Sequence, residues 1–313
     1  MVLYPPVSDK KGTVVPEPAP SSKGPQMGDG QDQPIESFGS WSAEDAFTKL
    51  AQLKRRLMRP CQRGEPPIRC FIIREKGMTG MYPVFRLFLE PVQGGRAEKF
   101  LMAGKKSATA RTSYFIISTE FDPSTVNEDG GLGKVRGNGD GTQFMIYDSG
   151  SNPERHTGGR SVRKELGLVK YTFNPNNPAA MECWVPKLNP NGSMFIWQPA
   201  TPHHSIDKAV GSQDTVDLVR LKNRLPKWDP VQKGNVLDFK GRVTEISVKN
   251  FILECDGESE ESTSLLFGRV GKDKFSMDVQ FPLSLYQAFS ICVSILDRKT
   301  AEVLTSYSLF SSS

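Results

Sequence analysis

The stretch FPLSLYQAFSICVSIL, residues 281–296, decides the fold of this chain. Proline at position 282 suits the first turn of an α-helix, where its missing N–H costs nothing. At about 100° per residue, the apolar side chains that follow cover nearly the whole helix circumference instead of forming one stripe. Such a helix must be enclosed, and it is too short for a bilayer span, which needs roughly 20 apolar residues. The stretch therefore predicts a helix buried inside protein, and it implies no catalysis.

The composition indicates a globular chain with an uneven charge. The 313 residues are 37% hydrophobic and 24% charged, with a formal net charge of +5. Residues 1–40 sum to −2, so the remainder carries +7, a modest preference for anionic partners. The five cysteines are scattered without metal-ligand spacing, which favours a reducing compartment and argues against zinc and disulfides. We expect no cofactor, no signal peptide and no membrane span.

Composition divides the chain into four parts: residues 1–40, 41–66, 67–302 and 303–313. The first part is rich in Pro, Gly, Ser and Gln and is expected to be disordered, because it cannot bury enough apolar surface to offset the entropy of ordering. The second holds a predicted basic amphipathic helix at 42–58 and a linker. The basic end of this helix, Lys54-Arg55-Arg56, is read as a solvated helix end, with a nuclear-import or membrane-surface patch as the alternative. The last part is a tail.

From residue 69 onward, the pattern predicts short strands separated by turn residues. About twelve antiparallel strands before an all-apolar helix favour a closed barrel, because a barrel of that size is too wide for its own side chains to fill. The predicted fold class is therefore mainly β: a closed antiparallel barrel of about twelve strands, filled by the hydrophobic C-terminal α-helix. The strands are expected at residues 69–74, 84–91, 99–103, 114–118, 143–148, 168–173, 181–185, 194–197, 215–221, 235–239, 243–255, 262–270 and 274–281.

Lys134 and Arg136 are the candidate anion ligands. On a strand their side chains point to one face, about 7 Å apart, and glycines flank them. Two cations held in this way match an anion with more than one phosphate, and the guanidinium can bind it bidentately. From these residues alone, a solvated strand face is the favoured alternative. The surrounding run is not a nucleotide-binding P-loop, since Glu128 stands where that motif needs its first glycine.

The sequence contains no recognisable catalytic constellation. His156, His203 and His204 lie in loops rich in Pro, Gly or Asn, and no nucleophile motif accompanies them. We therefore expect no enzymatic activity and keep an enzyme only as a residual hypothesis. Nucleic-acid binding has little support beyond net charge, because zinc-finger, ribonucleoprotein and zipper patterns are absent from the sequence.

Residues 239–251, FKGRVTEISVKNF, closely resemble the tubby-like family. Three further matches follow the family order: GKVR at 133–136, FGRV at 267–270 and AFSI at 288–291. The likeness covers about residues 67–301 and includes the buried helix. It implies a closed barrel threaded by its C-terminal helix. It also implies a non-enzymatic domain that binds phosphatidylinositol 4,5-bisphosphate at the inner plasma membrane.

The resemblance also implies the site residues. The family's lysine and arginine phosphate ligands fall on Lys134 and Arg136, and its further arginine, in an Arg-x-Glu-Leu context, falls on Arg163. Its headgroup-contacting Asn or Asp aligns with Tyr114, which alters that contact. The family's basic run before this position is thinned, which predicts weaker general attraction to anionic lipid at roughly 1 kcal/mol per cation. The cations that remain of it are Lys105, Lys106 and Arg111.

Two functional hypotheses follow. In the first, the chain is a monomeric phosphoinositide-binding adaptor, cytoplasmic and peripheral at the inner plasma membrane, that is released when the lipid is hydrolysed. Its residues 1–66 would engage an unidentified protein partner in the trafficking of membrane or ciliary cargo. In the second, it is a DNA-binding transcription regulator that shuttles between plasma membrane and nucleus. The F-box of plant relatives is absent, so a ubiquitin-ligase adaptor is not expected.

Overall fold

The computed structural model describes nine segments of the chain: residues 43–76, 82–91, 98–108, 110–126, 131–155, 161–174, 177–230, 234–259 and 262–297. The predicted disorder of residues 1–40, the tail at 303–313 and His156 lie outside the described residues.

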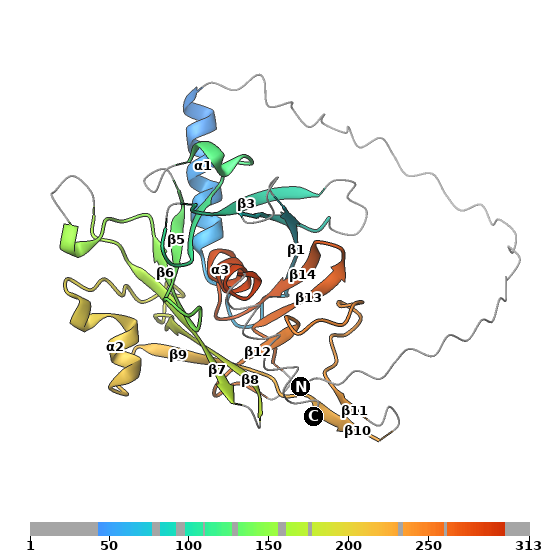
Figure 1. The fold of residues 1–313 in the computed structure, drawn as a ribbon. Helices are drawn as coiled ribbons and strands as arrows, with labels where there is room; N and C mark the ends of the chain where they lie inside the picture. The colour runs from blue at the N-terminus through green and yellow to red at the C-terminus, as the bar shows by residue number, and fades with distance from the viewer. Residues whose placement is uncertain are drawn as a thin grey trace, which may run out of the picture.

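A closed antiparallel barrel forms the body of the molecule (Figure 1). Its strands follow one another round the ring in the order β1-β14-β13-β12-β9-β8-β7-β6-β5-β4-β3-β2, and β1 closes the ring by pairing with both β2 and β14. This confirms the predicted fold class. The barrel strands are β1 (Ile68–Glu75), β2 (Val84–Leu89), β3 (Lys99–Lys106), β4 (Tyr114–Ser118), β5 (Gly133–Gly137), β6 (Gln143–Asp148), β7 (Glu165–Asn174), β8 (Asn177–Pro186), β9 (Leu218–Asn223), β12 (Phe251–Cys255), β13 (Leu265–Gly271) and β14 (Lys274–Val279). A separate pair consists of β10 (Lys227–Asp229) and β11 (Gly234–Val236).

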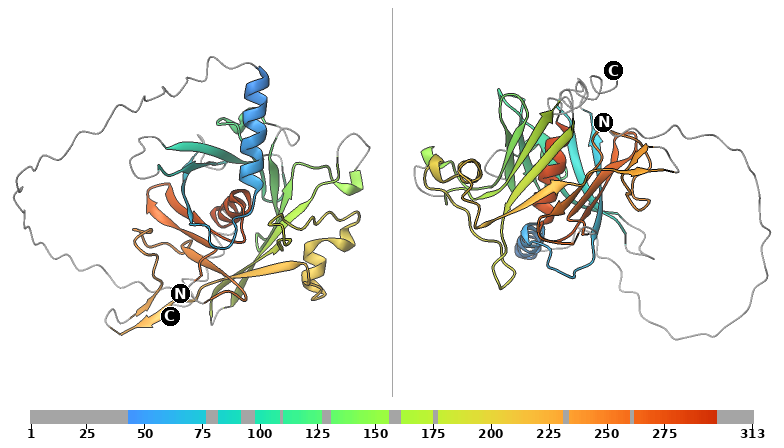
Figure 2. Two further views of the ribbon diagram at one scale, coloured as in Figure 1. Left: turned by 180° about the vertical axis from the view of Figure 1, so that it is seen from behind. Right: turned by 90° about the horizontal axis from the view of Figure 1, so that it is seen from below.

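Helix α3 (Leu285–Leu296) fills the barrel, and all of its residues are buried. Figure 1 shows it end-on inside the ring of strands, and the right-hand view of Figure 2 shows it from the side. Its polar side chains bond the barrel wall: Gln287 Nε2 donates to Leu166 O at 2.8 Å, and Ser294 Oγ lies 2.7 Å from Tyr171 Oη. The prediction of a helix buried on every side is confirmed.

The start of α3 differs from the prediction. Ser284 is the N-cap, and it forms a capping box in which Gln287 N donates to Ser284 Oγ at 3.2 Å and Ser284 N donates to Gln287 Oε1 at 2.9 Å. Pro282 therefore precedes the helix, and its predicted place in the first turn was wrong. The reciprocal cap satisfies two backbone donors at once, which sets the helix start more strongly than a proline does.

Helix α1 (Ala43–Met58) covers the barrel end at which α3 begins (Figure 2). Leu57 and Cys61 are buried in the main core, and Cys61 N donates to Leu283 O at 3.0 Å. The end of α1 is thereby fixed to the strand-to-helix connection that leads into α3. The third helix, α2 (Ile206–Gly211), packs near β7.

Three strand predictions were wrong or incomplete. Strand β5 was missing from the predicted set because its glycine-rich sequence has low strand propensity. Residues 194–197 form only an isolated bridge at Met194. Residues 237–250 are loop. Phe239 and Val243 pack against Ile252 and Leu266 on the outer wall of the barrel, whereas Ile246 and Val248 are exposed.

Candidate functional site

Strand β5 presents the two predicted cations on the outer wall. Val135, between them, is fully buried and faces α3, so Lys134 and Arg136 point outward by strand alternation. Lys134 is only 6% exposed, whereas Arg136 is an exposed residue. On this wall, Lys134 is therefore almost completely covered by its neighbours, whereas Arg136 is accessible to solvent.

Tyr114 is the neighbour of Arg136 across the β4–β5 pair. The Arg136 guanidinium carbon lies 4.6 Å from the centroid of its ring, a cation–π contact. Stacking of this kind covers one face of the guanidinium and leaves its in-plane N–H donors directed outward. Where the family pattern has an Asn or Asp, this chain therefore has an aromatic platform for the arginine.

Tyr147 lies beside both Lys134 and Arg163, and sequence reasoning did not identify it. It pairs with Lys134 across β5 and β6, and the guanidinium carbon of Arg163 lies 4.0 Å from its ring centroid. Burial raises the pKa of Tyr147, with Arg163 acting in the opposite direction. The alternation within β6 could have signalled this residue, because it places Tyr147 on the outer face beside Lys134.

Arg163 reaches this position from the connection before β7. Its backbone N donates to Ser151 O at 2.9 Å, and a Cβ at Gly150 would collide with the Arg163 backbone, so glycine is required there. Within the described part of the chain, Arg163 Nη1 is buried without a hydrogen-bond partner. The side chain lines a cavity of about 290 Å³ between the outer face of β6 and the 199–208 segment.

Glu165 supports the far side of that cavity. It is 3% exposed and accepts a hydrogen bond from Ile206 N at 2.7 Å, which anchors the start of α2. Burial raises the pKa of this carboxyl, and the Ile206 bond and Arg163 act against that rise. The carboxylate is therefore committed to the scaffold of the site.

The remaining basic run divides into two roles. Lys106 Nζ lies 2.7 Å from Asp297 Oδ2, whose side chain is fully buried at the C-terminal end of α3, so Lys106 belongs to the scaffold. Lys105 pairs with Ile116, which in turn pairs with Lys134. Lys105 therefore lies on the same outer wall as the candidate ligands, while Arg111 is exposed in the β3–β4 connection.

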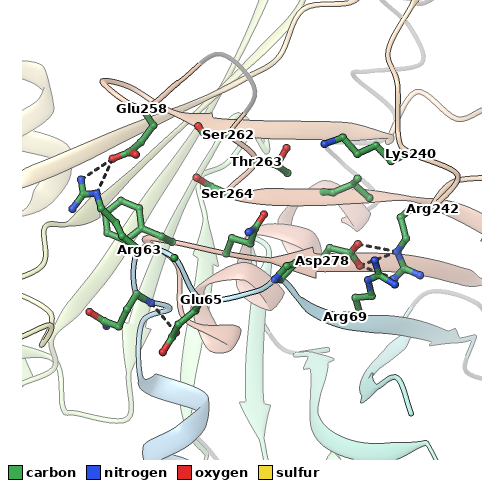
Figure 3. Close-up of a pocket in the computed structure, with 16 residues that line it drawn as sticks. Arg63, Glu65, Arg69, Lys240, Arg242, Glu258, Ser262, Thr263, Ser264 and Asp278 are labelled. Atoms are coloured by element: carbon green, nitrogen blue, oxygen red, sulfur yellow. Dashed lines mark hydrogen bonds and ion pairs between the residues drawn. The ribbon is translucent and has the colours of Figure 1, made fainter. Parts of the chain in front are cut away.

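A larger cavity, of about 480 Å³, lies on the other side of the barrel (Figure 3). It is lined by residues of β1, β13 and β14, and β13 stands six strands from β5 in the ring. Its charged groups largely bind one another: Arg63 donates to Glu258 at 2.6 Å, and Arg242 donates to Asp278 at 2.6 Å (Figure 3). These ion pairs give it the character of a structural polar cluster.

The described residues contain no group of three or more His, Cys, Asp or Glu side chains placed to hold a metal ion. None of their helices is long and apolar enough to cross a membrane.

A closed barrel filled by its C-terminal helix is the fold that the resemblance to the tubby-like family implies, and comparison with known proteins agrees. A family model described as the Tub family matches residues 57–298, so the chain belongs to that family. Tubby-related protein 2 of Homo sapiens is 38% identical over 239 residues, 72% of this chain and 45% of that protein. Tubby protein homolog 1 of Caenorhabditis elegans is 35% identical over 246 residues, 74% of this chain and 57% of that protein. The chain spans about half the length of the curated relatives it matches.

Proposed function

We propose that this protein is a membrane-associated adaptor whose barrel binds phosphatidylinositol 4,5-bisphosphate in the inner leaflet of the plasma membrane. The observation that carries the proposal is the shared outward face of Lys134 and Arg136 on β5, with Arg163 joined to the same group through Tyr147. Three cations on one wall suit a headgroup that carries several phosphates.

The aromatic platforms support this function energetically. Tyr114 and Tyr147 hold two guanidinium groups in fixed planes before any ligand arrives. A side chain that is already ordered loses less entropy when it binds, which saves about 0.5–1.5 kcal/mol per side chain. The wall is therefore preorganised for bidentate contacts with phosphate oxygens.

The adaptor role follows from joining this wall to residues 1–66. In the proposal that N-terminal region engages a protein partner while the barrel holds it at the membrane, in the trafficking of membrane or ciliary cargo. Hydrolysis of the lipid releases the protein, because a headgroup with fewer phosphates accepts fewer charge-assisted hydrogen bonds.

Sedimentation with vesicles that contain the bisphosphate lipid tests the proposal. The Lys134→Ala/Arg136→Ala variant is expected to bind at least about 150-fold more weakly, since hydrogen bonds to charged groups contribute about 1.5–3 kcal/mol each. The matched control is Lys240→Ala/Lys272→Ala, which removes the same charge from exposed residues near β13 and β14. If the first variant binds as tightly as the control, the proposal is wrong.

A further inference from the structure

Phe121 is a large apolar side chain on the wall that carries the candidate ligands. It follows β4 and is 55% exposed. Single exposed apolar residues are common and need no explanation by themselves. Phe121 differs because the structure fixes its ring and places cations beside it.

Arg86 holds Phe121 from below. Its Nε donates to Phe121 O at 2.8 Å, and its guanidinium carbon lies 4.4 Å from the ring centroid. The ring also meets Phe100 edge-on at 5.1 Å between centroids. Arg86 itself is 7% exposed and ion-paired with Glu75. The exposed ring is therefore held in one orientation.

The strand register relates the position of Phe121 to the cations on the same outer wall. Arg86, beneath the ring, pairs with Ala103, and Ala103 pairs with Ser118. The next outward row, two residues further along the strands, contains Lys105, Ile116 and Lys134. Two residues along a strand span roughly 7 Å. Phe121, which contacts Arg86 on β2 and Phe100 on β3, thus lies about one row from Lys105, and Lys134 lies two strands further round the same outer wall.

Asp122, the residue after Phe121, is under the influence of the charges on the same wall. Hydrogen bonds from Ser124 lower the pKa of Asp122, and the charges of Lys105 and Arg86 add to that lowering. Lys105 also offsets the negative charge of Asp122 at this position.

We propose that Phe121 inserts into the lipid interface beside the bound headgroup, so that the outer wall of β3–β5 is a mixed cationic and apolar membrane contact. The inference rests on the proposed function. Aromatic rings favour the interface between headgroups and acyl chains, and adjacent cations attract anionic lipid. Half-buried Ile116, between Lys105 and Lys134, adds apolar surface to the same wall. This alternation of cations with apolar side chains fits a lipid surface.

Binding to defined vesicles is the first test. Phe121→Ala is expected to weaken binding to vesicles of neutral lipid plus the bisphosphate lipid about three- to tenfold, as loss of a half-buried aromatic predicts. Its binding of soluble inositol trisphosphate is expected to stay unchanged, because the ring lies outside the headgroup site. Leu225→Ala is the matched control, since Leu225 is 60% exposed and follows β9, four strands from β5.

A Phe121→Trp variant reports insertion directly. Its emission, taken as the difference from the unsubstituted protein, is expected to shift to the blue on vesicles and to be quenched by brominated acyl chains. Glu120→Gln is expected to strengthen vesicle binding, because it removes an exposed carboxylate next to the inserted ring.

The outcomes separate this inference from the function on which it rests. Weaker vesicle binding by Phe121→Ala with intact headgroup binding supports it. Equal vesicle binding, or an unshifted Trp emission, overturns it even where Lys134→Ala/Arg136→Ala abolishes binding. If Phe121→Ala loses only a protein partner, the ring belongs to a protein contact and the inference is also overturned. A protein that binds neither vesicles nor headgroup contradicts both.

Discussion

Gly133 is the residue at which the core and the candidate site meet. A Cβ at this position would collide with Tyr147 O and with Tyr286 Oη, and these two atoms form a hydrogen bond of 2.7 Å. Tyr147 and Lys134, the next residue, both belong to the candidate site. Through this one close contact, Tyr286 of α3 therefore fixes the positions of β5 and β6, the two neighbouring strands that carry Lys134 and Tyr147.

Gly133→Ala is expected to destabilise the protein by about 1–3 kcal/mol, since the added methyl overpacks a buried contact. Urea unfolding followed by circular dichroism measures the change. Gly139→Ala is the control, because nothing lies within 4 Å of the position of its added Cβ. Equal unfolding midpoints for the two variants would contradict the proposed close packing.

Lys249 makes a prediction about pH. Burial and then Arg74 lower its pKa to about 8, while Asp297 opposes the shift. Between about pH 8 and the unfolded value near 10.5, the unfolded chain binds more protons than the folded one, so this residue makes the free energy of unfolding rise with pH. The contribution is fully present above that window and is lost as the pH falls through it.

Lys249→Met is expected to remove this rise. Denaturant unfolding at pH 7.5 and pH 10 measures it as the difference between variant and unsubstituted protein, which cancels the other lysines. A difference that stays constant across the two pH values would show that Lys249 titrates normally in the fold.

Among individual residues, the sequence predicted those whose spacing along a strand determines the face on which they lie. Lys134 and Arg136 follow from strand alternation, and the structure places both on the outer face. Alternation within β6 indicates that Tyr147 lies on the outer face, but its contact with Arg163 could not be predicted, because it joins β6 to a connection that no periodicity describes. Tyr114 was aligned as a departure from the family, but its stacking under Arg136 depends on the register of β4 and β5.

At the scale of elements, α3 provides the side chains that fill the interior of the barrel. Phe289 is fully buried, and a Cβ on Gly104 of β3 would lie 3.4 Å from its ring. Phe289→Asp is therefore expected to unfold the whole domain, since an unpaired carboxylate would be buried in an apolar core.

A thermal melt followed by circular dichroism tests this expectation, with Phe289→Leu as the volume-tolerant control that should retain a cooperative transition. If Phe289→Asp melts normally but fails to bind lipid, the helix has a direct functional role and the purely structural role given to it here is wrong.

The elements that sequence mispredicted share a cause. Strand β5 exists because tertiary packing overrides the low strand propensity of its glycines. The apolar pattern at 237–250 mimics a strand, yet Leu237, Phe239 and Val243 cover the outside of β12 and β13. Ile246 and Val248 of the same pattern are exposed. A local apolar pattern therefore leaves open which surface, if any, covers each side chain.

At the scale of the whole molecule, ring closure follows from a geometric conflict that the sequence already contains. A helix that is apolar on all sides needs a protein enclosure. A barrel of this many strands is too wide for its own side chains to fill, so it needs a filling. The helix and the barrel meet each other's need. The ring order adds what sequence could not supply, namely that β13 and the large cavity lie opposite β5. In the proposed orientation, the wall of β3–β5 meets the membrane and that cavity faces the cytosol.

The position of α3 after every strand of the barrel has a consequence for biosynthesis. A ribosome delivers residues 68–279, the complete wall, before it delivers the helix at 285–296. Until then the nascent wall has no interior, and its apolar inner face is open to aggregation or to capture by chaperones. Productive folding must therefore wait until translation has passed α3, and a premature stop codon just ahead of it would yield every strand without a stable fold.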